Sequence, residues 1–371
     1  MKLTEKFFAG WKTACRTMVV GLLAIGMAGC EKETADGNSD EPAPPVTPTP
    51  EPGNDACTFA LILNEGSGND AGLSRLDLAT GSIDNNWFAS ANGRQMGNNG
   101  QDLVAYGTKV YVTVTESNSL EVVNPATGLS QRVDMGSRKP RSIAADNGKL
   151  YITCYDKTVV RMDTATLTID GACPLGDFRP EGIAIAQGKA FVASTWNNEG
   201  GYNYDNTLYI IDLATFSNPE TIHFGMNTEN VQRMDDNHVI VTWRGNYGDI
   251  AAGSAIVDAT TLEVIPTAEP LSKMDIYGGK AYGYSLEYDE YYNETSTFRI
   301  VKADGTAEAF PFTPSLDANA YGINVNPDNG DIFIMSADYQ TNGDIYCFSA
   351  DGTLKYKKET AVNPSKMVFL K

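Results

Sequence analysis

The sequence of 371 residues predicts an all-β chain, a seven-bladed β-propeller of four-stranded blades, and three observations predict it. Short β-rich runs joined by glycine-containing turns recur from Phe59 to the end of the chain. The third run of each unit ends in a shared turn, and the last run of the chain supplies a strand that the first unit lacks. Four strands in every 40 to 50 residues or so is the spacing of a propeller blade.

The first 29 residues are predicted to be a signal peptide, followed by a tether over 30–57 and the propeller over 58–371. Basic residues precede an apolar run, 18–28, that is short for a membrane-spanning helix. The run ends in Met27-Ala28-Gly29-Cys30, and small residues before a cysteine resemble the lipobox of bacterial lipoproteins. That resemblance implies cleavage before Cys30 and its acylation, which gives a stable membrane anchor. An ordinary secretory signal with an incidental cysteine is the alternative.

The tether, residues 31–57, is polar, acidic and rich in proline, so it cannot bury apolar surface. Its start, Glu31-Lys32-Glu33, loosely resembles the surface-export signal of Bacteroidetes lipoproteins. We therefore expect a chain that is lipid-anchored in the outer membrane and faces the extracellular side.

The hairpin at the start of each unit is the clearest repeat. Residues 139–153 and 179–193 each contain two β-rich runs joined by a glycine-containing turn, which is a hairpin pattern. Counted by the start of its second run, the hairpin occurs seven times: at Leu61, Val110, Leu150, Ala190, Val239, Ala281 and Ile332.

The third run of each unit ends in a tight turn. Asp and Asn side chains bond to backbone two residues on, and Gly accepts a positive φ, so both suit such turns. The turns begin at Asp77, Asn124, Asp163, Asp212, Asp258, Asp304 and Asp351. A fourth, more polar run closes each unit.

The two ends of the repeat complement each other. The first unit begins at its second strand, residues 58–64, whereas residues 363–370 read as a first strand. Asn363-Pro364-Ser365 mirrors Lys139-Pro140-Arg141. We therefore expect the C-terminal strand to complete the first blade, because a closed ring leaves no unpaired edges. A β-sandwich with chance internal similarity is the alternative.

Composition excludes several functions. A net charge of -19 argues against a nucleic-acid partner, which requires a basic surface. Two histidines, and no G-x-S-x-G, P-loop or H-E-x-x-H pattern, give little support to catalysis. We expect no enzyme activity, no required cofactor and no metal site. Because a strand is predicted between Cys154 and Cys173, we expect these two cysteines, with Cys57 and Cys347, to be buried free thiols.

Candidate ligand-binding residues fall in the connections on one face of the propeller. The loops between second and third strands are long in the last four blades and rich in Trp and Tyr, which suit binding surfaces. Packing of these rings against one another is the alternative. The connections that enter each blade add polar groups, Glu181, Asn227 and Glu229 among them, which suit a neutral, amide- or hydroxyl-bearing ligand. The residues predicted to contact the ligand are Trp196, Tyr202, Tyr204, Trp243, Arg244, Tyr247, Tyr288, Tyr292, Tyr339, Asn99, Arg141, Arg179, Asn230 and Tyr321.

The lipobox cysteine, the acidic tether and the seven YncE-like units with D-x-A-T turns resemble Bacteroidetes surface propeller lipoproteins. Among these the chain is similar to the cobalamin-binding lipoproteins of the BtuG type. That resemblance implies capture of cobalamin (vitamin B12) or a related corrinoid, and transfer to a TonB-dependent outer-membrane transporter of the BtuB type. A glycan-binding accessory lipoprotein, a propeller hydrolase or lyase, and an adhesion protein remain alternatives.

Overall fold

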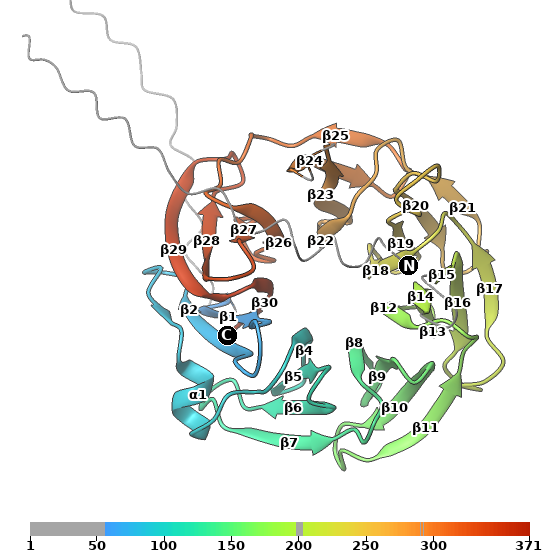
Figure 1. The fold of residues 1–371 in the computed structure, drawn as a ribbon, viewed down its shortest axis with the longest axis horizontal. Helices are drawn as coiled ribbons and strands as arrows, with labels where there is room; N and C mark the ends of the chain where they lie inside the picture. Colours follow the sequence, from blue (N-terminus) through green and yellow to red (C-terminus); the bar gives the residue numbers. More distant parts are fainter. Residues whose placement is uncertain (1–55, 198–202, 290, 292) are drawn as a thin grey trace, which may run out of the picture. The chain divides into compact units, whose positions relative to one another are not determined.

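The computed structural model describes residues 56–197, 203–289, 291 and 293–371 of the chain. Residues 56–371 form a ring of seven four-stranded antiparallel sheets, a β-propeller, as Figure 1 shows. The predicted fold is therefore confirmed. Within the described residues, no helix is long and apolar enough to cross a membrane.

Each blade runs from an inner strand to an outer strand. The first blade has the order β30 (Pro364–Leu370), β1 (Phe59–Asn64), β2 (Gly72–Asp77) and β3 (Ile83–Asp84). The second has β4 (Gly100–Tyr106), β5 (Lys109–Val114), β6 (Ser119–Val123) and β7 (Ser130–Asp134). The third has β8 (Pro140–Asp146), β9 (Lys149–Cys154), β10 (Thr158–Asp163) and β11 (Ile169–Pro174).

The later blades follow the same order. The fourth has β12 (Pro180–Ala186), β13 (Lys189–Ser194), β16 (Thr207–Asp212) and β17 (Glu220–His223), with a small hairpin of β14 (Trp196–Asn197) and β15 (Asn203–Tyr204) inserted. The fifth has β18 (Thr228–Arg233), β19 (His238–Trp243), β20 (Gly253–Asp258) and β21 (Val264–Pro266). The sixth has β22 (Lys273–Tyr277), β23 (Lys280–Tyr288), β24 (Glu294–Lys302) and β25 (Ala307–Ala309), and the seventh has β26 (Asn319–Val325), β27 (Ile332–Ala337), β28 (Asn342–Phe348) and β29 (Leu354–Val362).

The C-terminal strand closes the ring, as the sequence predicts. Strand β30 pairs antiparallel with β1, from Phe59 opposite Leu370 to Asn64 opposite Pro364. Inner strands of neighbouring blades also contact one another around the ring, and β30 contacts both β26 and β4. Side chains lock some of these junctions: Asp275 accepts the backbone N–H of Val325 at 2.8 Å, and Asn324 accepts that of Met367 at 2.8 Å.

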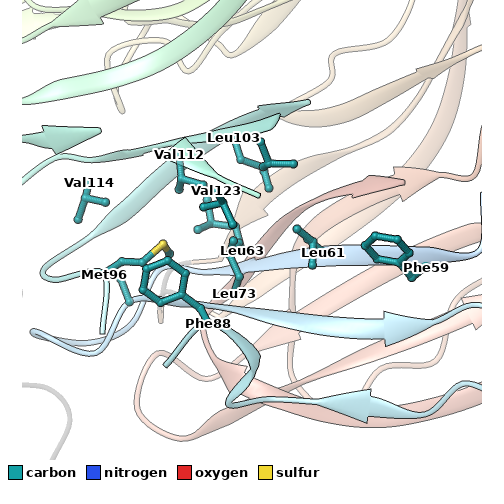
Figure 2. Packing of buried hydrophobic residues seen from close by; sticks show 12 residues of the cluster. Phe59, Leu61, Leu63, Leu73, Phe88, Met96, Leu103, Val112, Val114 and Val123 are labelled. Atoms are coloured by element: carbon teal, nitrogen blue, oxygen red, sulfur yellow. The ribbon is translucent and has the colours of Figure 1, made fainter. Parts of the chain in front are cut away.

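The core lies between adjacent blades, which is why the second strands are apolar on both faces. Every residue of β1 is buried, and Leu61 and Leu63 pack with Leu73 and Leu103 between the first two blades (Figure 2). Burying one such side chain contributes roughly 1.5 to 3 kcal/mol. The short helix α1 (Trp87–Asn92) adds the buried Phe88 to this cluster. The core thus holds the blades in fixed relative positions, so the loops at their ends form a defined surface.

The predicted aspartate turns are present. Asp163 Oδ1 accepts the backbone N–H groups of Thr166 at 2.9 Å and Ala165 at 3.0 Å, and Asp212 accepts that of Thr215 in the same way. The hydrogen bonds from Thr215 and its neighbour lower the pKa of Asp212.

The four cysteines among the described residues are free, and three of them, Cys154, Cys173 and Cys347, are buried. Strand β10 separates Cys154 from Cys173 as predicted. Cys57 is a correction, because it is only half-buried. It precedes β1, and its backbone N–H donates to the Asp328 carboxylate at 2.5 Å, so its side chain lies outside the first blade's core. Cys30 lies outside the described residues.

Candidate functional site

A β-bulge near the start of the inner strand recurs around the face where the inner strands begin, which we call the top face. Six blades carry this bulge, and the sixth blade keeps a regular register there. A bulge re-aims the side chain of the extra residue. The residues at these equivalent positions, one per blade, are called the mouth residues: Ser365, Gln101, Arg141, Glu181, Glu229, Lys273 and Tyr321.

Arg141 and Glu181 form the most buried ion pair among the mouth residues. Arg141 Nε lies 2.9 Å from Glu181 Oε2, and the two side chains are 15% and 10% exposed. Arg141 also donates to Gln101, and Tyr155 donates to Glu181 Oε1 at 2.5 Å. Burial, reinforced by the Glu181 charge, raises the pKa of Tyr155, so its hydroxyl stays protonated. Every charge in this group has a partner, which gives a rigid floor to the site.

The inserted loops of the fourth and fifth blades build an aromatic wall beside that floor. The Arg179 guanidinium lies 4.2 Å from the centre of the Trp196 ring and 4.8 Å from that of Tyr155. Trp196 pairs with Tyr204 across the β14–β15 hairpin. Tyr204 in turn meets Tyr247 edge to face, with ring centroids 5.9 Å apart. Short strands in the insertion therefore position rings that isolated loops would leave free to rotate.

The floor and the wall enclose a cavity of about 330 Å³, which we call the arginine cavity. It is lined by Arg141, Tyr155, Glu181, Thr195, Trp196, Tyr204, Asn227, Glu229, Arg244 and Tyr247. The structure thus brings five of the predicted contact residues together here. Tyr155 and Thr195 also line the cavity, although the sequence analysis did not select them. Glu181, Asn227 and Glu229, which the sequence analysis assigned to the entering connections, line it as well.

Two ion pairs line the cavity beside its neutral polar groups. Arg244 Nε and Nη2 donate to the two carboxylate oxygens of Glu229, each at 2.5 Å, a bidentate geometry. Burial alone would raise the pKa of Glu229, but Arg244 and then Lys273 hold it below its usual value. The cavity therefore combines strong local dipoles with no net excess of either charge among its lining residues.

A second group of aromatic residues lies on the top face over the sixth and seventh blades. We call it the tyrosine patch; it comprises Tyr284, Tyr288, Tyr321 and Tyr339, with Glu65 and Glu294. Tyr321 donates to Glu65 Oε2 at 2.6 Å, and Tyr288 donates to Glu294 Oε2 at 3.1 Å. Tyr339 meets Tyr321 edge to face at 5.4 Å. Burial raises the pKa values of Tyr288 and Glu294, and the Arg244 charge opposes that rise, so the patch interacts electrostatically with a residue of the arginine cavity.

Two exposed tyrosines, one in each group, have a strained backbone. Tyr247 has φ +56° and is 63% exposed, and Tyr339 has φ +67° and is 40% exposed. A left-handed backbone conformation costs a bulky L-residue roughly 1 to 2 kcal/mol. A solvent-exposed side chain gains little burial energy to offset that cost.

Three predicted contact residues do not line the cavity and make structural contacts elsewhere. Trp243 stacks on Phe224, which follows β17, with ring centroids 5.7 Å apart, so it packs between the fourth and fifth blades and does not line the cavity. Asn230 Nδ2 donates to the Ser272 carbonyl at 2.8 Å, which joins the fifth blade to the sixth. Asn99 has φ +63° and its carbonyl accepts the Thr115 N–H at 2.9 Å, a turn geometry that asparagine tolerates. Tyr202 and Tyr292 lie outside the described residues.

Neither a cluster of metal ligands nor a histidine lies at the arginine cavity among the described residues. Nowhere in those residues do three His, Cys, Asp or Glu side chains gather as a set of metal ligands. His238 Nδ1 lies 2.9 Å from the Asp235 carboxylate beside an inner hairpin turn, and His223 contacts Asn206 on the outer strand side. Neither histidine lines the arginine cavity.

Comparison with known proteins supports the fold alone. No family model and no curated protein matches the chain. Among solved structures, it is similar to the hydrazine synthase of Kuenenia stuttgartiensis, at 16% identity and TM-score 0.58, over 72% of this chain and 88% of the other. It is equally similar to a quinoprotein alcohol dehydrogenase-like protein of Bacteroides thetaiotaomicron, at 14% identity and TM-score 0.58, over 85% and 78%. Together with its seven sheets, these likenesses identify the chain as a β-propeller.

Proposed function

We propose that the top face captures a small ligand with a broad, partly apolar plate and amide groups at its edge, and that this ligand is a corrinoid such as cobalamin. The observation that carries the proposal is the arginine cavity, whose aromatic wall and paired ions adjoin the tyrosine patch. Aromatic side chains cover apolar ligand surface without losing much conformational entropy. Paired Arg and Glu groups offer both donors and acceptors to neutral amides.

The dimensions support contact across both groups of residues. A cavity of about 330 Å³ is at the lower end of small-molecule sites and would hold one edge of a corrinoid. The remainder of such a plate would extend over the tyrosine patch, with which Arg244 interacts electrostatically. Two exposed tyrosines with a positive φ would then contact the ligand, Tyr247 from the cavity and Tyr339 from the patch.

The proposal includes a cellular role. Acylation of Cys30 anchors the chain to the outer membrane, and the acidic tether holds the propeller on the extracellular side. The captured ligand passes to a TonB-dependent transporter of the BtuB type. The protein holds its ligand without transforming it and requires no cofactor. These parts of the proposal derive from the resemblance of the N-terminal segment and the repeat to surface propeller lipoproteins.

Calorimetric titration of the purified protein with cyanocobalamin and with cobinamide tests the ligand. We expect saturable binding at micromolar protein, with a shift in the visible spectrum of the corrinoid. A glycan panel and a hydrolase assay run in parallel distinguish the other candidate functions. Absence of binding to every corrinoid contradicts the proposal, and glycan binding in its place would identify a polysaccharide-uptake accessory protein.

A further inference from the structure

Two buried polar atoms of the tyrosine patch lack hydrogen-bond partners. Tyr284 is 0% exposed, and its hydroxyl meets no partner among the described residues. Glu294 Oε1 is likewise buried and unpartnered within the described part of the chain, whereas Oε2 accepts the Tyr288 hydroxyl. A buried polar atom without a partner destabilises the fold, most of all when it belongs to a carboxylate. Such atoms in a native site call for an explanation.

The two atoms belong to one face of one hairpin. In the β23–β24 pair, Tyr284 lies opposite Phe298 and Tyr288 lies opposite Glu294. Positions an even number of residues apart share a face of a strand, so these four side chains project to the same side. That side packs against the seventh blade, because Tyr284 and Phe298 share a cluster with Ile323 of β26. The hydroxyl and the carboxylate therefore face the space between the sixth and seventh blades.

The two groups share that strand face, and the Glu294 charge also acts on the Tyr284 hydroxyl. Burial is the main cause that raises the pKa of Tyr284, and the Glu294 charge is the next. Burial also raises the pKa of Glu294, because Tyr288 and Arg244 compensate its charge only in part. Arg244 is already bound to both carboxylate oxygens of Glu229. Glu294 thus lacks a dedicated cation in the described structure and has one oxygen free to accept a hydrogen bond.

The pair has the donor and acceptor pattern of an amide receptor. A protonated tyrosine hydroxyl donates one hydrogen bond, and an ionised carboxylate accepts without donating. A primary carboxamide presents the complement, a carbonyl oxygen beside an N–H₂ group. A ligand carboxylate would instead meet the Glu294 charge and be repelled.

We propose that Tyr284 and Glu294 form a subsite that binds one primary carboxamide of the captured ligand, with Tyr284 donating to its oxygen and Glu294 accepting from its nitrogen. This rests on the proposed function and names the ligand group that the tyrosine patch selects. Neither atom is exposed to solvent, so entry requires a side-chain rotation. Tyr288 and Tyr339 are exposed side chains whose hydroxyls act electrostatically on Tyr284, and rotation of their rings would open the subsite.

The test uses two near-isosteric variants of the full chain, Tyr284→Phe and Glu294→Gln, and measures both thermal stability and cyanocobalamin binding. Because the Tyr284 hydroxyl has no partner in the free protein, Tyr284→Phe should keep or raise the melting temperature and lower affinity about tenfold. Glu294→Gln should lower affinity for the amide-bearing ligand similarly. It should also narrow the preference for cyanocobalamin over cobyrinic acid, in which carboxyl groups replace the amides.

Tyr106→Phe is the matched control. The Tyr106 hydroxyl accepts the Gly148 N–H at 2.7 Å, at the inner hairpin turns opposite the top face. Its removal should lower the melting temperature and leave affinity unchanged.

The outcomes separate this inference from the proposed function. If the wild-type protein binds cyanocobalamin and both variants bind equally well, the subsite is wrong and the proposed function stands. If the wild-type protein binds no corrinoid, the proposed function fails and stability alone decides the subsite. A Tyr284→Phe variant that is less stable than wild type then shows that the hydroxyl already has a partner, such as a buried water, and overturns the inference. A variant at least as stable supports an unfilled polar site.

Discussion

The arginine cavity and the tyrosine patch adjoin on one face of the same propeller, yet they satisfy their polar groups differently. In the cavity, Arg141 and Arg244 each form a bidentate pair with a glutamate. In the patch, Glu294 and Tyr284 leave one buried atom each without a partner in the described structure. The cavity is therefore organised before the ligand arrives, whereas the patch has hydrogen bonds to gain on binding. We infer that the first group supplies a rigid surface and the second supplies selectivity.

The largest expected difference is in the response to loss of a carboxylate charge. Glu181→Gln should lower the free energy of unfolding by about 3 kcal/mol, because it leaves Arg141 buried without its counter-charge. The same change at Glu294 should leave stability unchanged or raise it, since that carboxylate has an unpartnered oxygen. Chemical denaturation of both variants measures the difference, and equal losses would contradict the distinction.

Loss of the aromatic wall should weaken binding more than folding. Trp196→Ala removes a ring that stacks with Arg179 and lines the cavity, so we expect a loss of about 2 kcal/mol of binding energy, roughly thirtyfold in Kd. Trp87→Ala is the control. Trp87 packs against the core of the first two blades, so that variant should lose stability and keep its affinity. Calorimetric titration of both variants decides between these outcomes.

The two groups should also respond to acid with opposite signs. The pKa of Glu229 lies below its usual value of 4.5. The ionised residue therefore stabilises the fold at pH values above 4.5, and this stabilisation is lost as the pH falls through the lowered pKa. The pKa of Glu294 is raised, so ionisation costs stability at neutral pH, and that cost disappears as the pH falls towards 4.5. In thermal denaturation, the melting temperature of wild type should exceed that of Glu229→Gln at neutral pH, and this difference should shrink on acidification. If Glu294→Gln melts at a higher temperature than wild type at neutral pH, that difference should also disappear on acidification.

The smallest effects should come from the strained tyrosines. Tyr247→Asn and Tyr339→Asn replace a bulky residue with one that tolerates a positive φ. Each variant should stay within about 1 kcal/mol of wild-type stability, because relief of strain offsets the lost edge-to-face contact. Each should still bind the ligand more weakly. A stability loss well above 1 kcal/mol with unchanged affinity would assign these tyrosines to packing alone.

The blades and their closure were predictable because they depend on repeated local signals. The hairpin pattern and the aspartate turns identify each unit, and residues 363–370 repeat the inner-strand pattern of the third blade. Apolar second strands follow from burial between blades. None of this requires knowing where a given side chain points.

Side-chain direction in the site was harder to predict, since the inner-strand bulges decide it. At the bulge of Glu229 and Asn230, the Glu229 carboxylate accepts from Arg244, and the Asn230 amide donates to the Ser272 carbonyl of the next blade. A shift of one residue exchanges the two faces of a strand, and the sequence gives no register for the bulge. Trp243 lies opposite Thr228, beside that bulge, and its ring stacks on Phe224.

A crystal structure of the protein with bound cyanocobalamin tests the central claim most directly. We expect the corrinoid on the top face, with one edge against Trp196 in the arginine cavity and one primary carboxamide bonded to Tyr284 and Glu294. A corrinoid bound on the opposite face or at the blade edges, or no bound corrinoid at saturating concentration, would contradict the account.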